Sequence, residues 1–144
     1  MLTRTHDADA VNRLVNHPDV RPGVGHPDMG ELDLSVAVAA PENWFLLGEH
    51  GGFALTWSSP RTYEVHTFML RSGRGKWAAD ARTEGVQYAA DRGAKTLWTR
   101  IPPQAPHVER FARQGGMQPT GEVIETLGTP YRIFSMEIKS CQPQ

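Results

Sequence analysis

The sequence predicts a single α+β domain built on a mixed, mostly antiparallel twisted sheet that is flanked by helices. The chain has 144 residues, of which 39% are apolar and 22% charged, a globular balance that suits one domain over 1–144. Helix-like and strand-like runs follow in the order α(α)βββ–α–β–α–ββ. One strand–helix–strand unit within this order requires a parallel crossover, whereas the neighbouring hairpins are antiparallel.

Short helices joined by a turn-rich loop are predicted for the N-terminal part. Asp7 can cap a helix from about Ala8 to Asn16, which Pro18 ends. The stretch HPDVRPGVGHPDMG, with three Pro and three Gly, is typical of a loop. ELDLSVAVAA fits either a short helix closed by Pro41 or an extended segment, and we favour the helix.

Three strands follow, and the first two form a hairpin. NWFLLGEH and FALTWS are apolar and aromatic runs separated by GG. TYEVHTFML is the most β-rich run, and its side chains alternate between two faces of the sheet. One face carries Tyr63, Val65, Thr67 and Met69, and the other carries Glu64, His66 and Phe68.

A long helix and a further strand complete the crossover unit. The helix from about Lys76 to Arg92 has a face of small residues, which lets its backbone lie close to a sheet, and Gly93 can end it. KTLWTRI is the next strand, and PHVERFARQG is a short helix with Pro106 in its first turn. EVIETL and YRIFSMEI then pair around GTP as the last hairpin. The small face is Ala78, Ala81, Gly85 and Ala89.

Charge and cysteine content argue against several functions. The net charge of −1 and the pI of about 6.6 disfavour broad electrostatic binding to nucleic acids or anionic lipids. The single cysteine, Cys141, permits no intrachain disulfide and no Cys-based metal site, which fits a cytoplasmic setting. No apolar run reaches the length of a signal peptide or a membrane span. We therefore expect no membrane partner and no nucleic-acid partner.

The loop RSGRGK before the long helix is the strongest functional signal. Gly73 and Gly75 let the backbone approach a ligand, and Arg71, Arg74 and Lys76 add positive charge. Unpaired amides and the dipole at a helix N-terminus favour an anion, so the combination suits a phosphate or a pyrophosphate. The loop could also be no more than a turn. It fits neither the Walker pattern nor the dinucleotide fingerprint.

The order of elements resembles the GCN5-related N-acetyltransferase (GNAT) fold over about Glu42–Ile138. The matching pieces are YEVHTFML, RSGRGKWA, the helix ending AADRGA, KTLWTRIP, and PHVERFARQGGM leading to GEV. YEVHTF and GRGKWA are particularly similar to bacteriophage-encoded members. The resemblance implies an acyl-CoA-dependent N-acetyltransferase that moves an acetyl group from acetyl-CoA to a primary amine. The amine would belong to a small molecule or a protein, in the cytoplasm of a bacterial or phage-infected cell.

The resemblance also implies where acetyl-CoA binds. In such proteins the loop amides hold the pyrophosphate, and the preceding strand parts from the next so that its open edge holds the pantetheine arm. The Asn that usually follows the later strand is absent from IPPQAPHV, where Gln104 or His107 could stand nearby. The phosphate cradle carried over is Arg71, Ser72, Gly73, Arg74, Gly75 and Lys76, and the arm is lined by Val65, Phe68, Met69 and Leu70.

Some positions depart from the family pattern. The family loop reads Gln/Arg-x-x-Gly-x-Gly/Ala, but Ser72 and Trp77 occupy its outer positions when Gly75 is taken as the first glycine. Trp77 could pack against the sheet or crowd the cofactor. The usual Tyr general acid maps to Ala112. These departures support an alternative, a GNAT-fold binding or assembly protein of phage type that has lost the chemistry. A phage-type role on host proteins or modified nucleobases is a third hypothesis.

Two neighbours on one strand face are the catalytic candidates. Removal of the amine proton needs a base with a pKa near 7, and His66 has the right intrinsic value. Glu64 can tune that pKa or act itself, directly or through a water. We therefore predict His66 first and Glu64 second. Both could instead be half-solvated structural residues.

The N-terminal loop NHPDVRPGVGH could contact the acceptor. A metal site is the sharper alternative, but no ligand spacing here is diagnostic, and we predict no metal. Exposed C-terminal strands of this kind often pair, so a homodimer is a further expectation. The polar side chains of the loop are His17, Asp19, Arg21 and His26.

Overall fold

A computed structural model describes residues 1–139, so Cys141 lies outside the described part of the chain. A 3-10 turn at Arg71–Gly73 joins β4 to α3, and two others, at Arg21–Gly23 and Pro27–Met29, lie between α1 and α2. The helices are α1 (Ala8–Val15), α2 (Ser35–Ala39), α3 (Lys76–Asp91) and α4 (Pro106–Gln114). The strands are β1 (Thr3–Arg4), β2 (Trp44–Gly48), β3 (Gly51–Ser59), β4 (Thr62–Met69), β5 (Thr96–Ile101), β6 (Gln118–Thr126) and β7 (Thr129–Glu137).

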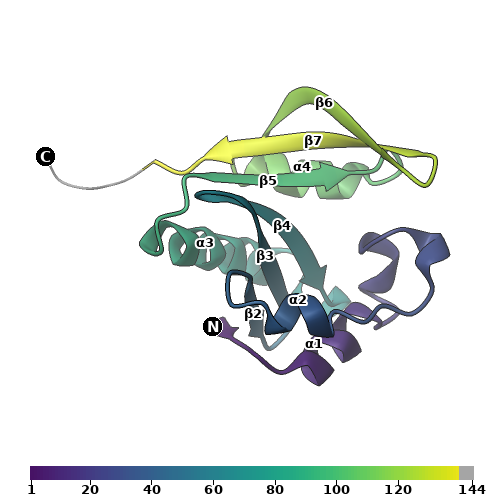
Figure 1. The fold of residues 1–144 in the computed structure, drawn as a ribbon, viewed down its shortest axis with the longest axis vertical. Coiled ribbons are helices and arrows are strands. Elements are labelled where there is room, and N and C mark those ends of the chain that lie inside the picture. Colours follow the sequence, from purple (N-terminus) through teal and green to yellow (C-terminus); the bar gives the residue numbers. More distant parts are fainter. Residues whose placement is uncertain (140–144) are drawn as a thin grey trace, which may run out of the picture.

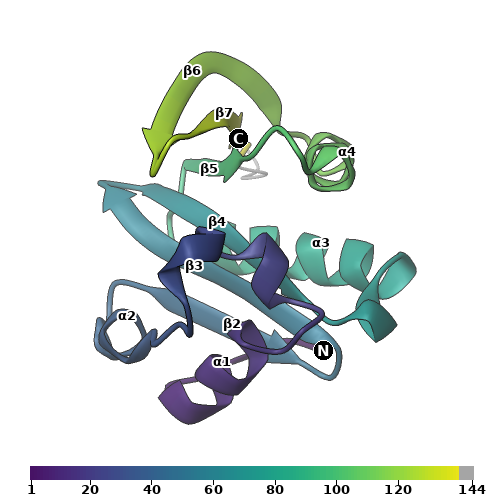
Figure 2. The same ribbon diagram turned by 90° about the vertical axis from the view of Figure 1, so that its right-hand side faces the viewer.

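The strands form a seven-stranded sheet in the order β1-β2-β3-β4-β5-β7-β6. Among the strand pairs of residues 1–139, β4–β5 is parallel and the others are antiparallel, which confirms the predicted mixed sheet with one crossover. α1 and α2 cover one face, and α3 and α4 cover the other (Figures 1 and 2). α3 packs against the half of the sheet that contains β2–β4, and α4 packs against the half that contains β5–β7 (Figure 2).

The helices lie where the sequence predicts them and end within one residue of the predicted ends. Asp7 caps α1 by accepting a hydrogen bond from the Ala10 N–H at 3.1 Å. The ambiguous segment after the loop is helical, as α2. Gly93 ends α3 in the left-handed region with φ of 87°, and the Ala94 N–H reaches back to the Ala89 carbonyl at 3.0 Å. The predicted small face of α3 is buried against the sheet.

Both hairpin turns lie one or two residues away from the predicted positions. The first turn is Glu49–His50, and the glycine pair that we placed in it belongs to β3. Gly51 and Gly52 are needed there because any Cβ would lie 2.1 Å from the Phe68 carbonyl oxygen or 1.9 Å from that of Leu46. The last turn is Leu127–Gly128, with positive φ at both residues, rather than GTP.

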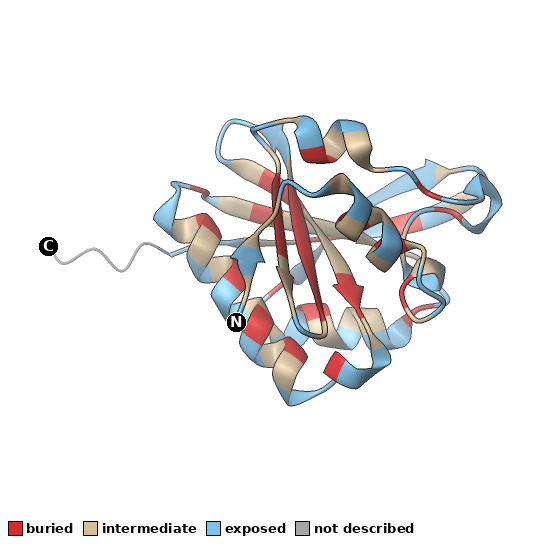
Figure 3. Ribbon diagram, turned by 90° about the horizontal axis from the view of Figure 1, so that it is seen from below, coloured by how far each residue is buried: buried red, intermediate tan, exposed pale blue. Residues whose placement is uncertain are grey.

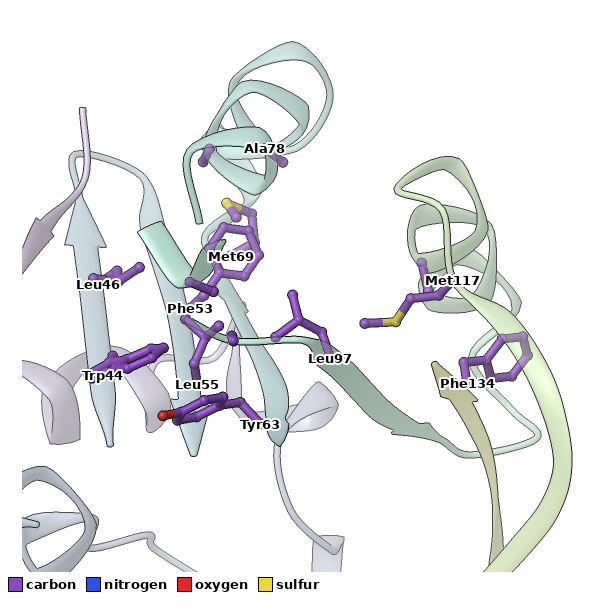
Figure 4. Close-up of a cluster of buried hydrophobic side chains, with 14 of the residues drawn as sticks. Trp44, Leu46, Phe53, Leu55, Tyr63, Met69, Ala78, Leu97, Met117 and Phe134 are labelled. Atoms are coloured by element: carbon purple, nitrogen blue, oxygen red, sulfur yellow. The ribbon is translucent and has the colours of Figure 1, made fainter. Parts of the chain in front are cut away.

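Two apolar clusters hold the layers together. The larger one lies between the sheet and α3 and α4, and the smaller one lies between the sheet and α1 and α2. Buried positions concentrate on the central strands and on the sheet-facing sides of the helices (Figure 3). Trp44 stacks on Tyr63 with ring centroids 4.2 Å apart at one end of the larger cluster (Figure 4). Leu97 lies between its two halves.

Candidate functional site

The parallel strands β4 and β5 pair over a short distance and then separate. Their register runs from Thr62 opposite Thr96 to Glu64 opposite Trp98 and stops there. Both strands continue beyond this point, β4 to Met69 and β5 to Ile101. The β5–β7 half of the sheet therefore diverges from the β2–β4 half, as Figure 2 shows. The separation leaves one edge of β4 without a strand partner.

The open edge of β4 presents the peptide groups of Thr67. The Thr99 hydroxyl donates to the Val65 carbonyl at 3.0 Å, so Val65 directs its peptide groups toward β5. Peptide groups in a strand alternate in direction, so Thr67 directs its N–H and C=O the same way, where β5 has already turned aside. Thr67 and Thr99 were missed as site residues because their role depends on the separation of the strands.

The loop at the end of β4 leads into a helix that has no side-chain cap. Within residues 1–139, the N–H groups of Gly75, Lys76, Trp77 and Ala78 find no hydrogen-bond partner. Gly75 stands at the N-cap position with φ of 100°, and within residues 1–139 no atom lies within 4 Å of the place where its Cβ would be. The four amides are aligned with the positive end of the α3 dipole, and those of Gly75 and Lys76 belong to exposed residues.

The loop between β4 and α3 is held in place by contacts with the β2–β3 turn. The Leu70 N–H donates to the His50 carbonyl at 3.0 Å, and the His50 Nδ1 lies 2.9 Å from the Ser72 hydroxyl. Gly73 is buried against the same turn, where a Cβ would come within 2.6 Å of the His50 Cβ. The Trp77 ring meets the His50 ring edge to face at 5.2 Å and packs on Gly48. Its indole is thus turned toward the sheet and is not among the residues that line the cleft.

A cleft opens between α3 and α4 beneath the separated strands. The space between its walls is about 600 Å³ when the open solvent at its mouth is included, and the walls are mostly apolar. Arg82 closes its outer side, because its Nη1 donates to the Phe111 carbonyl at 2.8 Å and its guanidinium lies 4.4 Å from the centre of the Phe111 ring. Ala112 is buried in the wall. The cleft also contacts Val65, Thr67, Gly85, Leu97, Thr99, Val108, Met117 and Met136.

The opposite face of the sheet brings the predicted catalytic pair together. The His66 Nε2 lies 3.6 Å from a carboxylate oxygen of Glu64 and 3.0 Å from the Thr56 hydroxyl. Glu64 is buried, and Arg100 of β5 contacts both of its oxygens, with Nε at 2.6 Å and Nη2 at 3.2 Å. Arg100 was not predicted as a site residue, because alternation along β5 would put it on this face but nothing in the sequence identifies its partner.

The surroundings of His66 favour its neutral form. Loss of hydration lowers the pKa of His66 below the ordinary 6.5, and Arg100 lowers it further, while Glu64 acts in the opposite direction. With the Glu64 carboxylate near Nε2, the proton of the neutral ring is favoured on Nε2. The Nδ1 lone pair, for which the structure of residues 1–139 gives no partner, is then available as a base.

The N-terminal loop contacts the loop before α3 and the start of β7. The Asp19 carboxylate accepts from the Arg71 N–H at 3.0 Å, and its main-chain carbonyl accepts from Arg74 at 3.2 Å. This contact lowers the pKa of Asp19. Further along, buried His26 lies 3.2 Å from the Thr129 hydroxyl at the start of β7. Arg21 donates to main-chain carbonyls of the loop itself, so its role here is structural.

The remaining predicted site residues are distributed as follows. Met69 is buried beside Gly73, and Phe68 and Leu70 pack in the cluster on the α1–α2 face, away from the cleft. Gln104 is exposed in the turn before α4. The Lys76 ammonium forms a 2.6 Å ion pair with Asp80, which raises the pKa of Lys76.

Within residues 1–139, the structure shows neither a metal-ligand cluster nor a helix that could span a membrane. No group of three or more His, Cys, Asp or Glu side chains is arranged to hold a metal ion in this part of the chain. Among the helices of residues 1–139, none has both the length and the apolar character needed to cross a bilayer.

Comparison with known proteins identifies the fold. No family model matches the sequence, and neither does any curated protein. YncA of Salmonella typhimurium, a proposed acetyltransferase solved with acetyl-CoA, matches 100% of this chain and 96% of its own at 15% identity and a TM-score of 0.76. A proposed GNAT acetyltransferase from Desulfovibrio desulfuricans gives 17% identity and 0.74 over 96% and 99%. Spermidine N-acetyltransferase from Vibrio cholerae, in complex with CoA and spermine, gives 12% identity and a TM-score of 0.72 over 96% of this chain and 95% of its own.

At these identities the comparisons establish the fold alone. The chain has the GNAT fold, an α+β architecture in which a mixed sheet lies between two pairs of helices. The fold class predicted from the sequence is thereby confirmed.

Proposed function

We propose that the protein is an acyl-CoA-dependent N-acetyltransferase that moves an acetyl group from acetyl-CoA to a primary amine. The observation that carries this proposal is the separation of β4 from β5 directly beside an uncapped helix N-terminus. Structures with the same fold were solved with acetyl-CoA or with CoA, which supports acetyl-CoA as the co-substrate here. The acceptor would be a small amine or an amine on a protein.

The loop fits a diphosphate. Four free amides, from Gly75 to Ala78, lie at the positive end of α3, and the missing side chain of Gly75 leaves space for phosphate oxygens. Arg71 and Arg74 are exposed beside these amides and add positive charge. Trp77 packs on His50 and Gly48 of the β2–β3 turn, so its indole is turned toward the sheet.

The open edge of β4 fits the pantetheine arm. The Thr67 peptide group can exchange hydrogen bonds with an amide of the arm, as a neighbouring strand would. Val65 lies where the strands close, so the thioester would come to rest there, beneath the face that carries His66. A main-chain N–H on the open edge can then polarise the thioester carbonyl.

His66 is proposed as the general base. It is neutral at physiological pH because its pKa is lowered, and its Nδ1 lone pair can accept the amine proton. Glu64 keeps the ring oriented from the Nε2 side, and its pairing with Arg100 suits it to that positioning role better than to proton transfer. A thiolate with a pKa near 8.5 can leave without a general acid, so the alanine at position 112 is compatible with turnover.

Acetyl-CoA binding and amine acetylation test this proposal. Isothermal titration with acetyl-CoA should give a saturable one-to-one isotherm, and a thiol-release assay with an amine panel should find an acceptor. His66→Gln should keep the binding and reduce the acetylation by about a hundredfold or more. Absence of binding at millimolar acetyl-CoA would overturn the proposal.

A second candidate is a GNAT-fold binding or assembly protein of phage type without catalysis, and Ala112 is the observation that favours it. In that case the protein would bind CoA without acetylating any amine, or bind nothing. His66→Gln would then leave the function unchanged, so the same variant separates the two candidates.

A further inference from the structure

We propose that the acyl site extends beyond an acetyl group and accepts chains of about four to six carbons. This inference rests on the proposed function. It starts from one observation, namely that the cleft between α3 and α4 continues past the point at which β4 and β5 close.

The direction of the cleft follows from the strands. From the loop, the open edge passes Thr67 and ends at Val65, one residue before the strands are paired again at Glu64 and Trp98. The cleft is also lined by Leu55 and Leu97, which lie at or beyond this closing point on the α3–α4 side. A thioester carbonyl held near Val65 would therefore have further space ahead of it.

The length of that space sets the chain length. From Thr99, beside the closing point, to Leu97 is two residues of strand, or about 7 Å. An extended six-carbon acyl chain spans a similar distance, and a four-carbon chain spans about half of it.

The deep end of the cleft is apolar. Leu55 and Leu97 are almost fully buried, and Met117 from the segment after α4 points toward Leu97 across the gap between the two halves of the core (Figure 4). Met136 of β7 pairs with Leu97 and completes the wall. Burial in such surroundings stabilises methylene groups, whereas an amide there would lose its hydrogen bonds to water. Methionine side chains can also move to accommodate a chain.

The polar groups of the cleft lie elsewhere. Thr67 and Thr99 line the separated strands, and Arg82 closes the outer side between the helices. These groups can form hydrogen bonds with the amides of the pantetheine arm. The part of the cleft that would hold the arm is therefore more polar than the deep end. The small side chain of Ala112 leaves this part of the cleft open, because a larger side chain at this position would project into it.

The transfer itself is unchanged by the longer chain. The C–S bond of the thioester breaks and a C–N bond to the acceptor amine forms. The proton of the amine passes to His66, and CoA leaves as the thiolate.

The test needs no acceptor. Isothermal titration of the whole protein with CoA, acetyl-CoA, butyryl-CoA, hexanoyl-CoA and octanoyl-CoA gives the affinity for each. Each methylene that enters the deep end should tighten binding by up to about fourfold, and the gain should end near six carbons. Equal affinities for acetyl-CoA and hexanoyl-CoA would overturn the inference and leave the proposed function standing. Binding of no thioester and no CoA would overturn the proposed function.

Two variants should move the preferred chain length in opposite directions. Ala112→Leu should reduce the hexanoyl-over-acetyl preference by about tenfold while CoA affinity stays within about twofold. Met136→Ala should extend the preferred length by about two carbons. Ala39→Leu, on the exposed side of α2, is the matched control and should change nothing. An affinity that keeps rising to octanoyl-CoA in all variants would indicate non-specific apolar binding and contradict the inference. Met136→Ala decides the matter where Ala112→Leu does not fold.

Discussion

Arg100 crosses the gap between the separating strands and places its Nε 2.6 Å from the buried carboxylate of Glu64. It lies two residues beyond Trp98, the last residue of β5 that pairs with β4. The ion pair therefore joins β4 and β5 where main-chain hydrogen bonds no longer do. The same contact fixes Glu64 beside His66, so strand geometry and the candidate catalytic group are coupled through one guanidinium.

Removal of this guanidinium should destabilise the protein. Arg100→Ala leaves a buried carboxylate unpaired, and we expect a loss of about 2 kcal/mol in the free energy of unfolding. The value is below that for a fully buried pair, because the Arg100 side chain is 35% exposed. Urea unfolding measures it. Arg113→Ala, which breaks an exposed ion pair with Glu109, is the control and should cost less than about 0.5 kcal/mol. Equal losses would contradict the importance of the Glu64 contact.

Protonation of His66 should make stability depend on pH. Because the pKa of folded His66 is below 6.5, the unfolded state binds more protons in the window between the two pKa values. The contribution of neutral His66 to the free energy of unfolding is therefore fully present above about pH 6.5 and is lost as the pH falls through this window. Urea unfolding at a series of pH values should show the slope, and His66→Gln should reduce it. An unchanged slope in the variant would assign the effect to another histidine.

Two glycine-to-alanine changes should have opposite effects on stability. In Gly73→Ala the new Cβ would lie 2.6 Å from the His50 Cβ and 2.8 Å from its carbonyl oxygen, so we expect a loss of about 1–3 kcal/mol. In Gly85→Ala, inside α3, the nearest atom is a Phe53 ring carbon at 3.6 Å, and we expect a gain of about 0.5–1 kcal/mol. Thermal melts compare the two. A stable Gly73→Ala protein would show that the β2–β3 turn does not constrain the loop.

The charge of Asp19 should weaken anion binding at the loop. Asp19→Asn keeps an oxygen acceptor for the Arg71 N–H but removes a negative charge beside the amides. We expect CoA affinity to rise by about two- to threefold at low salt and the gain to vanish at high salt. Titration at two ionic strengths measures it. A loss of affinity would mean that Asp19 acts by ordering the loop.

Trp77 should matter for stability and not for access to the loop. Trp77→Ala removes the packing on His50 and Gly48, and we expect a loss of about 2 kcal/mol in the free energy of unfolding. CoA affinity should not improve. A tighter CoA complex in this variant would mean that the indole crowds the phosphate site.

Local patterns predicted the elements of the fold because the causes of these elements are local. Alternation in β4 placed Glu64 and His66 on one face, and the small face of α3 predicted how closely that helix packs. The GG pair was misplaced because glycine signals a turn as readily as a close backbone approach. What decides between the two is the Phe68 carbonyl of the adjacent strand, which sequence alone does not place.

The site could be predicted only in part because much of it arises where strands part. Thr67 gains its role from the loss of a neighbour, and Arg100 gains its role from an acid on a different strand. Alternation along KTLWTRI puts Arg100 on the sheet face that Leu97 and Thr99 do not share. This signal could have placed Arg100 on the same face as His66. Alternation also puts Phe68 on the same sheet face as His66. The cleft lies on the other face, so Phe68 does not line it.

The contacts of His50 with the loop before α3 have a kinetic consequence. The His50 carbonyl accepts from the Leu70 N–H, and its ring contacts Ser72 and Trp77, so the loop is held in one conformation without any ligand. Association should then be a single bimolecular step, without the slow rearrangement that a folding loop would add. Stopped-flow traces should accordingly be monophasic, with a rate that rises linearly with ligand concentration.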